Sequence, residues 1–265
     1  MCDTCGCGDT NLVSVEIHTS LLVKNDHDAA HLRGHFGQAG VTAINVMGSP
    51  GSGKTALLEA TARAFGGRYR LAAVSGDLAT TYDADRLARA GIPSAAITTG
   101  TACHLDAAMV HDALHGTIGA AAGTSDFFFI ENVGNLVCPA IYDLGQRANV
   151  VALSVTEGVD KPLKYPVMFR HADLVVLTKV DLLPYLPEVS VGAIHEALAQ
   201  VMPVPRLIEV SATRNTGLDA WLAWLEEQRA ARPAPSAPRL VAHPASALGA
   251  PLRRYDLRAQ QGDSK

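Results

Sequence analysis

One eight-residue segment constrains the fold of this chain more than any other feature. It reads Gly48-Ser49-Pro50-Gly51-Ser52-Gly53-Lys54-Thr55 and fits the pattern G-x-x-x-x-G-K-[S/T] between the apolar run Ala43–Met47 and an Ala/Leu-rich segment. In such a strand–loop–helix context, backbone N–H groups surround a phosphate, the lysine contacts the β- and γ-phosphates, and the threonine hydroxyl binds Mg²⁺. The sequence therefore predicts a nucleotide-phosphate site formed by Gly48, Ser49, Gly51, Ser52, Gly53, Lys54 and Thr55.

Short apolar runs alternate with Ala/Leu-rich segments of helical length along most of the chain. This alternation predicts an α/β fold, a P-loop domain with a mostly parallel sheet and helices on both of its faces. The predicted strands are Ala43–Met47, Leu71–Ser75, Phe127–Ile130, Val150–Val155, Leu174–Leu177 and Leu207–Val210. Glycines mark the ends of three predicted helices, Ala56–Phe65, Ala84–Ala90 and Leu105–His115.

Composition divides the 265 residues into four regions. Residues 1–10 form a Cys-rich leader, and residues 11–40 form a linker or N-terminal helical segment. Residues 41–229 form the predicted nucleotide-binding domain. Residues 230–265 are rich in proline and alanine without a sustained apolar period, so we expect this tail to be disordered.

Charge and hydropathy exclude two classes of partner. The formal net charge is -4 and no long basic run occurs, whereas a nucleic-acid interface needs clustered lysine and arginine. No stretch approaches the roughly 18–20 apolar residues of a membrane span, and the N-terminus lacks the pattern of a signal peptide. We therefore expect a cytoplasmic protein that binds neither nucleic acid nor membrane.

Two further segments are candidates for the catalytic machinery beside Lys54. The predicted strand Phe127–Ile130 leads into Glu131, which can hold Mg²⁺, and the N–H of Gly134 can contact a γ-phosphate. Asp77 follows the predicted strand Leu71–Ser75, where it can hold Mg²⁺ or orient the attacking water. A helix-capping or loop aspartate is an equally good interpretation of Asp77. The candidate catalytic residues are Lys54, Asp77, Glu131 and Gly134, and the candidate magnesium ligands are Thr55, Asp77 and Glu131.

The segment Thr178-Lys179-Val180-Asp181 is the candidate base-recognition site. It resembles the N-K-x-D motif of GTPases, in which the aspartate accepts hydrogen bonds from guanine and the lysine stem covers the ring. Adenine lacks that pair of donors, so Asp181 favours GTP. Thr178 stands where the motif has asparagine, and Ser211-Ala212 resembles the segment whose backbone contacts the guanine oxygen.

The cysteines form two candidate metal sites. Cys2, Cys5 and Cys7 place three soft ligands within six residues, a set that suits Ni²⁺ or Zn²⁺, although unbound terminal thiols are the alternative. Cys103, His104 and Cys138 give at most three ligands per chain, so two facing chains would complete a site; unrelated buried thiols are the alternative.

Three histidines in the second region raise a similar question. His27, His31 and His35 recur every four residues and share one face if this segment is helical. Such a stripe can bind a metal, but it is more often a solvated helix face.

Five segments together resemble the HypB family of hydrogenase nickel-incorporation GTPases. They are the leader Cys2–Cys7, the loop Gly48–Thr55, Cys103–Ala107, Glu131–Pro139 and Thr156–Pro166. The resemblance implies a SIMIBI-class G domain that dimerises with GTP. It also implies a nickel/zinc site at the dimer interface formed by Cys103, His104 and Cys138, and a high-affinity nickel site at Cys2, Cys5 and Cys7. The chain lacks the long polyhistidine tract of some relatives, which argues against bulk nickel storage.

The function that this resemblance implies is a low-turnover, Mg²⁺-dependent GTPase that cycles between GTP and GDP and delivers nickel during [NiFe]-hydrogenase maturation. The implied partners are a second copy of the chain, the zinc-binding hydrogenase accessory protein and the large-subunit precursor. Three alternatives stay open: a P-loop small-molecule kinase, a maturation GTPase for another nickel enzyme such as urease, and a nucleotide-independent nickel carrier.

Overall fold

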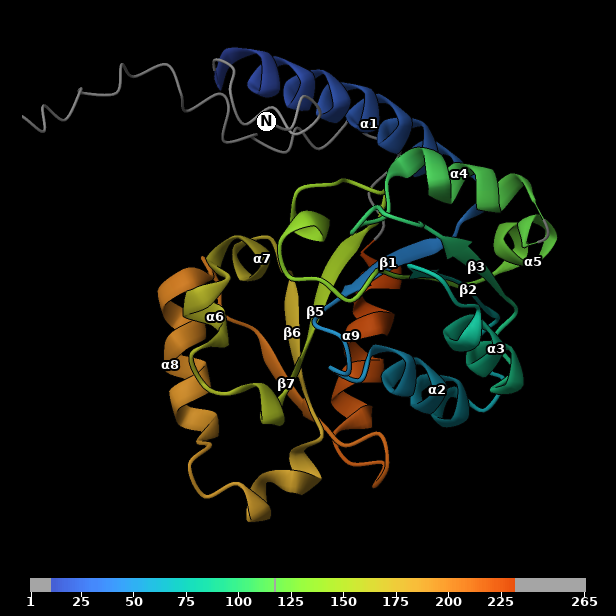
Figure 1. The fold of residues 1–265 in the computed structure, drawn as a ribbon. Coiled ribbons are helices and arrows are strands. Elements are labelled where there is room, and N and C mark those ends of the chain that lie inside the picture. Colours follow the sequence, from blue (N-terminus) through green and yellow to red (C-terminus); the bar gives the residue numbers. More distant parts are fainter. Residues whose placement is uncertain (1–10, 117, 232–265) are drawn as a thin grey trace, which may run out of the picture.

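The computed structural model describes residues 11–116 and 118–231, and Figure 1 shows its arrangement. The predicted leader and nearly all of the predicted tail lie outside these residues. In the described part of the chain, seven strands form one parallel sheet in the order β3-β2-β4-β1-β5-β6-β7. The strands are β1 (Thr42–Met47), β2 (Leu71–Asp77), β3 (Ser94–Thr98), β4 (Phe127–Glu131), β5 (Ala148–Ser154), β6 (Leu174–Thr178) and β7 (Leu207–Val210).

Helices cover both faces of this sheet. They are α1 (Asn11–Ala39), α2 (Lys54–Phe65), α3 (Tyr82–Arg89), α4 (Ala107–His115), α5 (Gly119–Thr124), α6 (Lys161–Lys164), α7 (Pro166–Arg170), α8 (Val191–Val201) and α9 (Leu218–Ala230). Three short 3₁₀ turns complete the described elements: η1 (Cys138–Ala140), η2 (Val155–Glu157) and η3 (Val180–Tyr185). Among the described residues, no helix is long and apolar enough to cross a membrane.

The alternation of side chains along each strand builds a separate core on each face. Phe127 and Phe129 of β4 pack with α2 and α9, whereas Phe128 and Ile130 of the same strand pack with α1, α4 and α5. Strands buried on both faces are nearly all apolar, which is why the sequence shows continuous runs there. The predicted α/β fold is confirmed.

Two predicted features differ from the structure. The edge strand β3 was not expected, because its sequence, Ser-Ala-Ala-Ile-Thr, lacks a strong apolar run and is only half-buried. The helix expected over Leu105–His115 begins at Ala107 instead, since the Asp106 side chain caps it by accepting a hydrogen bond from the backbone N–H of Met109.

The second half of α1 packs onto the domain. Leu32 and Phe36 lie in the core beneath it, and Arg33 forms an ion pair of 2.6 Å with Asp143. Asn25 joins α1 to α4, because its side-chain oxygen accepts a hydrogen bond of 2.9 Å from the first N–H of α4. Figure 1 shows α1 and α4 side by side along the same edge of the molecule.

Candidate functional site

The phosphate loop crosses the carboxyl end of β1, at the centre of the sheet. Its first glycine, Gly48, has a φ of +147°, and a side chain there would collide with the backbone oxygen of Ala152 on β5. The loop thus approaches the neighbouring strand more closely than any residue with a Cβ allows. Its last glycine, Gly53, leads directly into α2, whose N-terminus favours an anion.

Lys54 lies buried beneath the loop at the start of α2. Its Nζ donates hydrogen bonds to the backbone oxygens of Gly48 at 3.2 Å and Ser49 at 3.1 Å. Burial lowers the pKa of Lys54, and the nearby carboxylates of Glu131 and Asp83 oppose that shift. The ammonium group is therefore held against the loop that would carry the phosphates.

Thr55 joins two carboxylates into a cluster of oxygen atoms beside the loop. Its hydroxyl lies 2.6 Å from Glu131 Oε1 and 2.9 Å from Asp83 Oδ1. The second oxygen of Glu131 is buried and has no hydrogen-bond partner among the described residues. Because Mg²⁺ prefers oxygen ligands, a hydroxyl and two carboxylates, one of which has an unpaired buried oxygen, fit this ion.

Asp83 is a site residue that the sequence did not reveal. It lies in the first turn of α3, where acidic residues are common for reasons of helix electrostatics alone. Arg86 steadies this end of α3, since it lies 3.5 Å from Asp83 and forms a bidentate ion pair with Glu59 of α2. Only the packing of α3 beside α2 shows that Asp83 faces Thr55.

Asp77 has another set of contacts in the described structure. Its Oδ1 accepts hydrogen bonds from the N–H groups of Ala79 and Thr80 at 2.9 and 2.7 Å, and from the Thr80 hydroxyl. These bonds lower the pKa of Asp77 and keep it ionised. Asp77 thus caps its own loop here, and its role toward Mg²⁺ or water stays a prediction.

The cluster predicts a pH dependence of stability. Burial raises the pKa of Glu131 to about 7 from 4.5, so in metal-free protein the folded state keeps a proton that the unfolded chain releases. This stabilising contribution is therefore complete below about pH 4.5 and is lost as the pH rises through about 7, a change on the order of a few kcal/mol. We expect urea unfolding without divalent metal to show this loss.

The variant Glu131→Gln serves as the control, because glutamine keeps the shape and cannot titrate. Its stability should lack the decrease between about pH 4.5 and pH 7. Added Mg²⁺ should stabilise the wild type more at the upper end of this range, where the carboxylate is ionised. Parallel pH profiles for the two proteins in the absence of metal would contradict this account of Glu131.

Thr178 and Lys179, at the end of β6, brace the phosphate loop. The Thr178 hydroxyl donates a hydrogen bond of 2.6 Å to the backbone oxygen of Ser52, and Lys179 Nζ donates one of 2.6 Å to that of Gly51. Lys179 has a φ of +59°, a conformation that non-glycine residues rarely adopt. Threonine thus supplies a loop-bracing bond at the position where the motif has asparagine.

Asp181 and Ser211 come together from different strand ends, as the base-recognition hypothesis requires. Asp181 Oδ1 accepts a hydrogen bond of 2.5 Å from the Ser211 hydroxyl, and Thr213 lies 3.4 Å from its other oxygen. The Ser211 bond lowers the pKa of Asp181, so the group is a carboxylate. Ala212 follows in the same turn, and its backbone oxygen accepts a bond from Arg63.

Cys103, His104 and Cys138 form a half-buried cluster in which one ligand atom from each lies within 4.8 Å of the others. The two Sγ atoms are 2.7 Å apart, and Cys103 Sγ lies 3.9 Å from Nδ1 of His104. The His104 ring stacks on Tyr142 at a centroid distance of 3.8 Å, and burial lowers the pKa of His104. Two thiols and a neutral imidazole are ligands that Ni²⁺ or Zn²⁺ accept. The other predicted thiol ligands, Cys2, Cys5 and Cys7, lie outside the described residues.

One segment of eight residues, Glu131–Cys138, connects this cluster to the phosphate loop. A side chain at Gly134 would approach Pro50 of the loop to 2.9 Å, and Asn135 forms a backbone bridge with Gly48. The Asn135 side chain then donates a bond of 3.1 Å to the backbone oxygen of Cys103. Asn135 thus contacts both the phosphate loop and the thiol cluster.

Comparison with known proteins shows the family of this chain. Residues 42–205 match the family described as "CobW/HypB/UreG, nucleotide-binding domain". The hydrogenase maturation factor HypB of Azotobacter chroococcum mcd 1 is 47% identical over 218 residues, which cover 82% of this chain and 70% of that protein. This chain belongs to the HypB family.

Solved structures of HypB proteins support the same assignment. The crystal structure of HypB from Helicobacter pylori in complex with nickel is 40% identical, with a TM-score of 0.73 over 78% of this chain and 95% of that one. HypB from Archaeoglobus fulgidus is 36% identical, with a TM-score of 0.71 over 78% of this chain and all of that one. The resemblance to the HypB family that the sequence motifs indicated is confirmed.

Proposed function

We propose that this HypB-family chain is a GTP-hydrolysing nickel metallochaperone in [NiFe]-hydrogenase maturation. One observation carries the proposal: the segment Glu131–Cys138 begins at the oxygen cluster, passes against the phosphate loop and ends in the thiol cluster. Such a connection suits a protein in which hydrolysis controls a metal site. A small-molecule kinase has no use for it.

For hydrolysis, the chain supplies charge and position. Thr55, Asp83 and Glu131 would hold Mg²⁺, which when bound neutralises charge on the β- and γ-phosphates. Lys54 would place its ammonium group on the same phosphates, and Asp77 would contact magnesium or orient water after leaving its loop-capping position. Asp181 would accept the two guanine donors while Ser211 and Ala212 complete the base site.

For switching, the Gly134 N–H would contact the γ-phosphate of GTP and lose that contact after hydrolysis. Because Gly134 and Asn135 touch the loop and Asn135 also holds Cys103, a change there would reach the thiol cluster directly. Each chain offers three ligands, so a GTP-dependent dimer would face two sets of Cys103, His104 and Cys138 around nickel or zinc. The nickel complex of the H. pylori relative supports the choice of metal.

Delivery belongs to the same proposal. Nickel held at Cys2, Cys5 and Cys7 would pass to the Cys103 site and on to the hydrogenase large-subunit precursor, with the zinc-binding accessory protein as partner. The family supports this route, and a cytoplasmic location follows from it. Relatives from Helicobacter species are named hydrogenase/urease maturation factors, so another nickel enzyme is the second candidate recipient.

The test measures nickel stoichiometry and oligomeric state together, in GDP and in a non-hydrolysable GTP analogue. We expect the analogue to produce a dimer and to change nickel binding in the wild type. In the variant Cys103→Ala, Cys138→Ala the metal response should disappear, because both thiolates of the described cluster are lost.

The control is Cys2→Ala, Cys5→Ala, Cys7→Ala, which removes three thiols elsewhere in the chain and should keep the response to nucleotide. Nickel binding that is identical in both nucleotide states and unaffected by the Cys103 and Cys138 substitutions would overturn the switch. The leader would then be a nucleotide-independent nickel carrier.

A further inference from the structure

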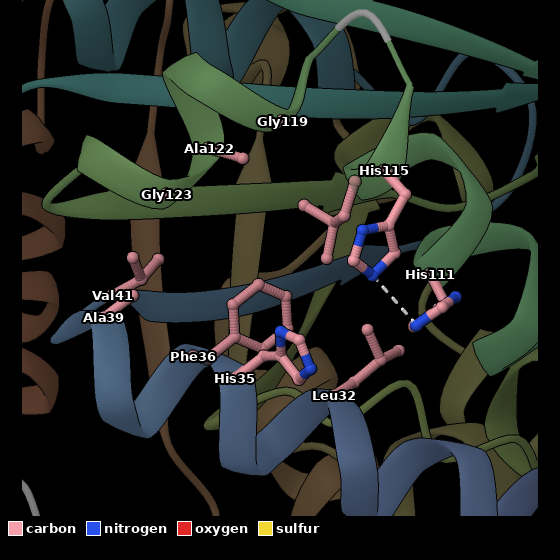
Figure 2. Close-up of a pocket in the computed structure, with 11 residues that line it drawn as sticks. Leu32, His35, Phe36, Ala39, Val41, His111, His115, Gly119, Ala122 and Gly123 are labelled. Carbon is pink, nitrogen blue, oxygen red and sulfur yellow. Dashed lines mark hydrogen bonds between the residues drawn. The ribbon is translucent and has the colours of Figure 1, made fainter.

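Four histidines from two helices gather on the surface where α1 meets α4. His31 and His35 lie one turn apart on α1, with ring centroids 4.5 Å apart, and His111 and His115 lie one turn apart on α4, at 4.2 Å. Across the two helices, the centroids of His31 and His111 are 5.5 Å apart and those of His35 and His115 are 5.8 Å apart. Figure 2 shows His35, His111 and His115 pointing toward one another.

We propose that this four-histidine cluster is a second metal site, which binds one divalent transition-metal ion of the class that imidazole prefers, such as Ni²⁺, Cu²⁺ or Zn²⁺. His27 continues the same spacing on α1 but is exposed beside Asp28 and takes no part. The cluster shares no residue with the phosphate, base or thiol sites, so the proposal does not rest on the proposed function.

Within each helix the nitrogens already have the spacing of two ligands on one ion. Nε2 of His31 lies 3.3 Å from Nε2 of His35, and Nε2 of His111 lies 3.0 Å from Nε2 of His115. Two adjacent nitrogens on a four-coordinate ion with bonds of about 2.0–2.1 Å are separated by about 2.9–3.4 Å. Two such pairs together supply a complete four-nitrogen coordination sphere.

Between the helices a small adjustment is needed. In the described part of the chain, the thiol cluster is the one group of three or more possible metal ligands whose ligand atoms all lie within 4.8 Å of one another. The nitrogens of the four histidines therefore do not all lie within this distance across the two helices. Imidazole rings on a single ion have centroids about 5 Å apart. Across the helices, His111 lies 5.5 Å from His31 and 6.2 Å from His35, and His115 lies 5.8 Å from His35. His31, His35 and His115 are exposed and His111 is half-buried. Exposed side chains change rotamer on short timescales, so ring rotation of the three exposed histidines can bring the two pairs onto one ion.

The neighbouring rings disfavour a charge on His35. Partial burial, followed by the nearby His31, His115 and His111, lowers the pKa of His35. The Nε2 of His111 faces His115 at 3.0 Å, whereas its Nδ1 lies 3.7 Å from a carboxylate oxygen of the exposed Asp112, too far for a hydrogen bond.

The two helices form a firm scaffold for such a site. Leu32 and Phe36 of α1 share a buried core with Val110 of α4, and Asn25 is bonded to the first N–H of α4. An apolar pocket of about 250 Å³, with Leu32 and Phe36 on its wall, opens beside His35 and His115 (Figure 2).

The experiment uses the full chain and measures bound Ni²⁺ by equilibrium dialysis. We expect His111→Ala, His115→Ala to bind about one equivalent less than the wild type, because two ligands of a four-nitrogen site are lost. The matched control His27→Ala, His195→Ala removes two exposed histidines outside the cluster and should bind as the wild type does. Unfolding temperatures measured in a chelator should be the same for all three proteins.

Two further measurements separate this site from the thiol site. The variant Cys103→Ala, Cys138→Ala should still bind the equivalent of Ni²⁺ that the histidine variant loses. Co²⁺ bound at the four-histidine cluster should give an absorption spectrum without thiolate charge-transfer bands. Equal stoichiometry in His111→Ala, His115→Ala and in the control would overturn the proposal. The proposal would also be overturned if the equivalent of Co²⁺ that is lost in His111→Ala, His115→Ala shows thiolate charge-transfer bands in the wild type. Nickel binding at Cys103 and Cys138 that is the same with GDP and with the GTP analogue would overturn the proposed function, but it would not contradict the four-histidine site.

Discussion

The variant Asp83→Asn is expected to hydrolyse GTP about 10²-fold more slowly than the wild type and to need more Mg²⁺ for its half-maximal rate. The Asp83 carboxylate lies 2.9 Å from the Thr55 hydroxyl, in the oxygen cluster that includes buried Glu131. Asparagine keeps the volume and one oxygen but removes the charge that attracts a cation. Steady-state phosphate release, measured over a range of Mg²⁺ concentrations, gives both quantities.

The matched control is Asp85→Asn. Asp85 lies in the same first turn of α3, is exposed, and accepts a hydrogen bond from the Thr81 hydroxyl. Each substitution removes one negative charge from the same helix terminus, so any effect of the helix dipole is common to both. Equal hydrolysis rates and equal Mg²⁺ requirements in the two variants would show that Asp83 is not a magnesium ligand.

The variant Asp181→Asn is expected to bind GTP about 10²–10³-fold more weakly and to gain affinity for xanthosine triphosphate. The loss follows because a carboxylate that accepts two guanine donors is replaced by an amide that offers a donor to one of them. Xanthine has a carbonyl oxygen where guanine has its amino group, so the amide N–H finds an acceptor there. Calorimetric titration with both nucleotides measures the two changes.

The Asp181→Asn variant also tests whether guanine is recognised by Asp181 itself. Ser211 donates a hydrogen bond to Asp181 and would still find an amide oxygen in the variant, so the turn should keep its structure. ATP should bind weakly to both proteins, since adenine lacks the donor pair. A variant that prefers GTP over the xanthine nucleotide as strongly as the wild type does would place guanine recognition elsewhere.

The fold could be predicted from the sequence wherever burial on both faces forces an apolar run. Strands β1, β4 and β6 are buried throughout, so their sequences show no polar alternation and stand out from the helices. The edge strand β3 could not be predicted, because Ala95 and Ala96 bury little surface and a half-buried strand shows only a weak hydrophobic pattern. Strand order across the sheet also depends on tertiary packing, which no local pattern records.

The candidate site could be predicted where its residues follow a strand directly. Glu131 ends β4, whereas Lys54 and Asp181 lie in the segments that follow β1 and β6; ligands of open α/β sheets bind at these carboxyl ends of the strands. Asp83 could not be predicted in this way, because its position depends on how α3 packs against α2. The same reason hid His111 and His115, which meet His31 and His35 across an interface between helices distant in sequence.

The segment Glu131–Cys138 fixes, through covalent bonds, the separation between a carboxylate on the nucleotide side and a thiol on the metal side. Contacts along it hold its register: Asn132 accepts a hydrogen bond from the backbone of Leu105, and Asn135 pairs with the phosphate loop. A residue inserted between Asn132 and Asn135 would break the register of these two contacts. The number of residues in the segment, and not only the ligands at its two ends, therefore sets how the nucleotide side is joined to the metal side.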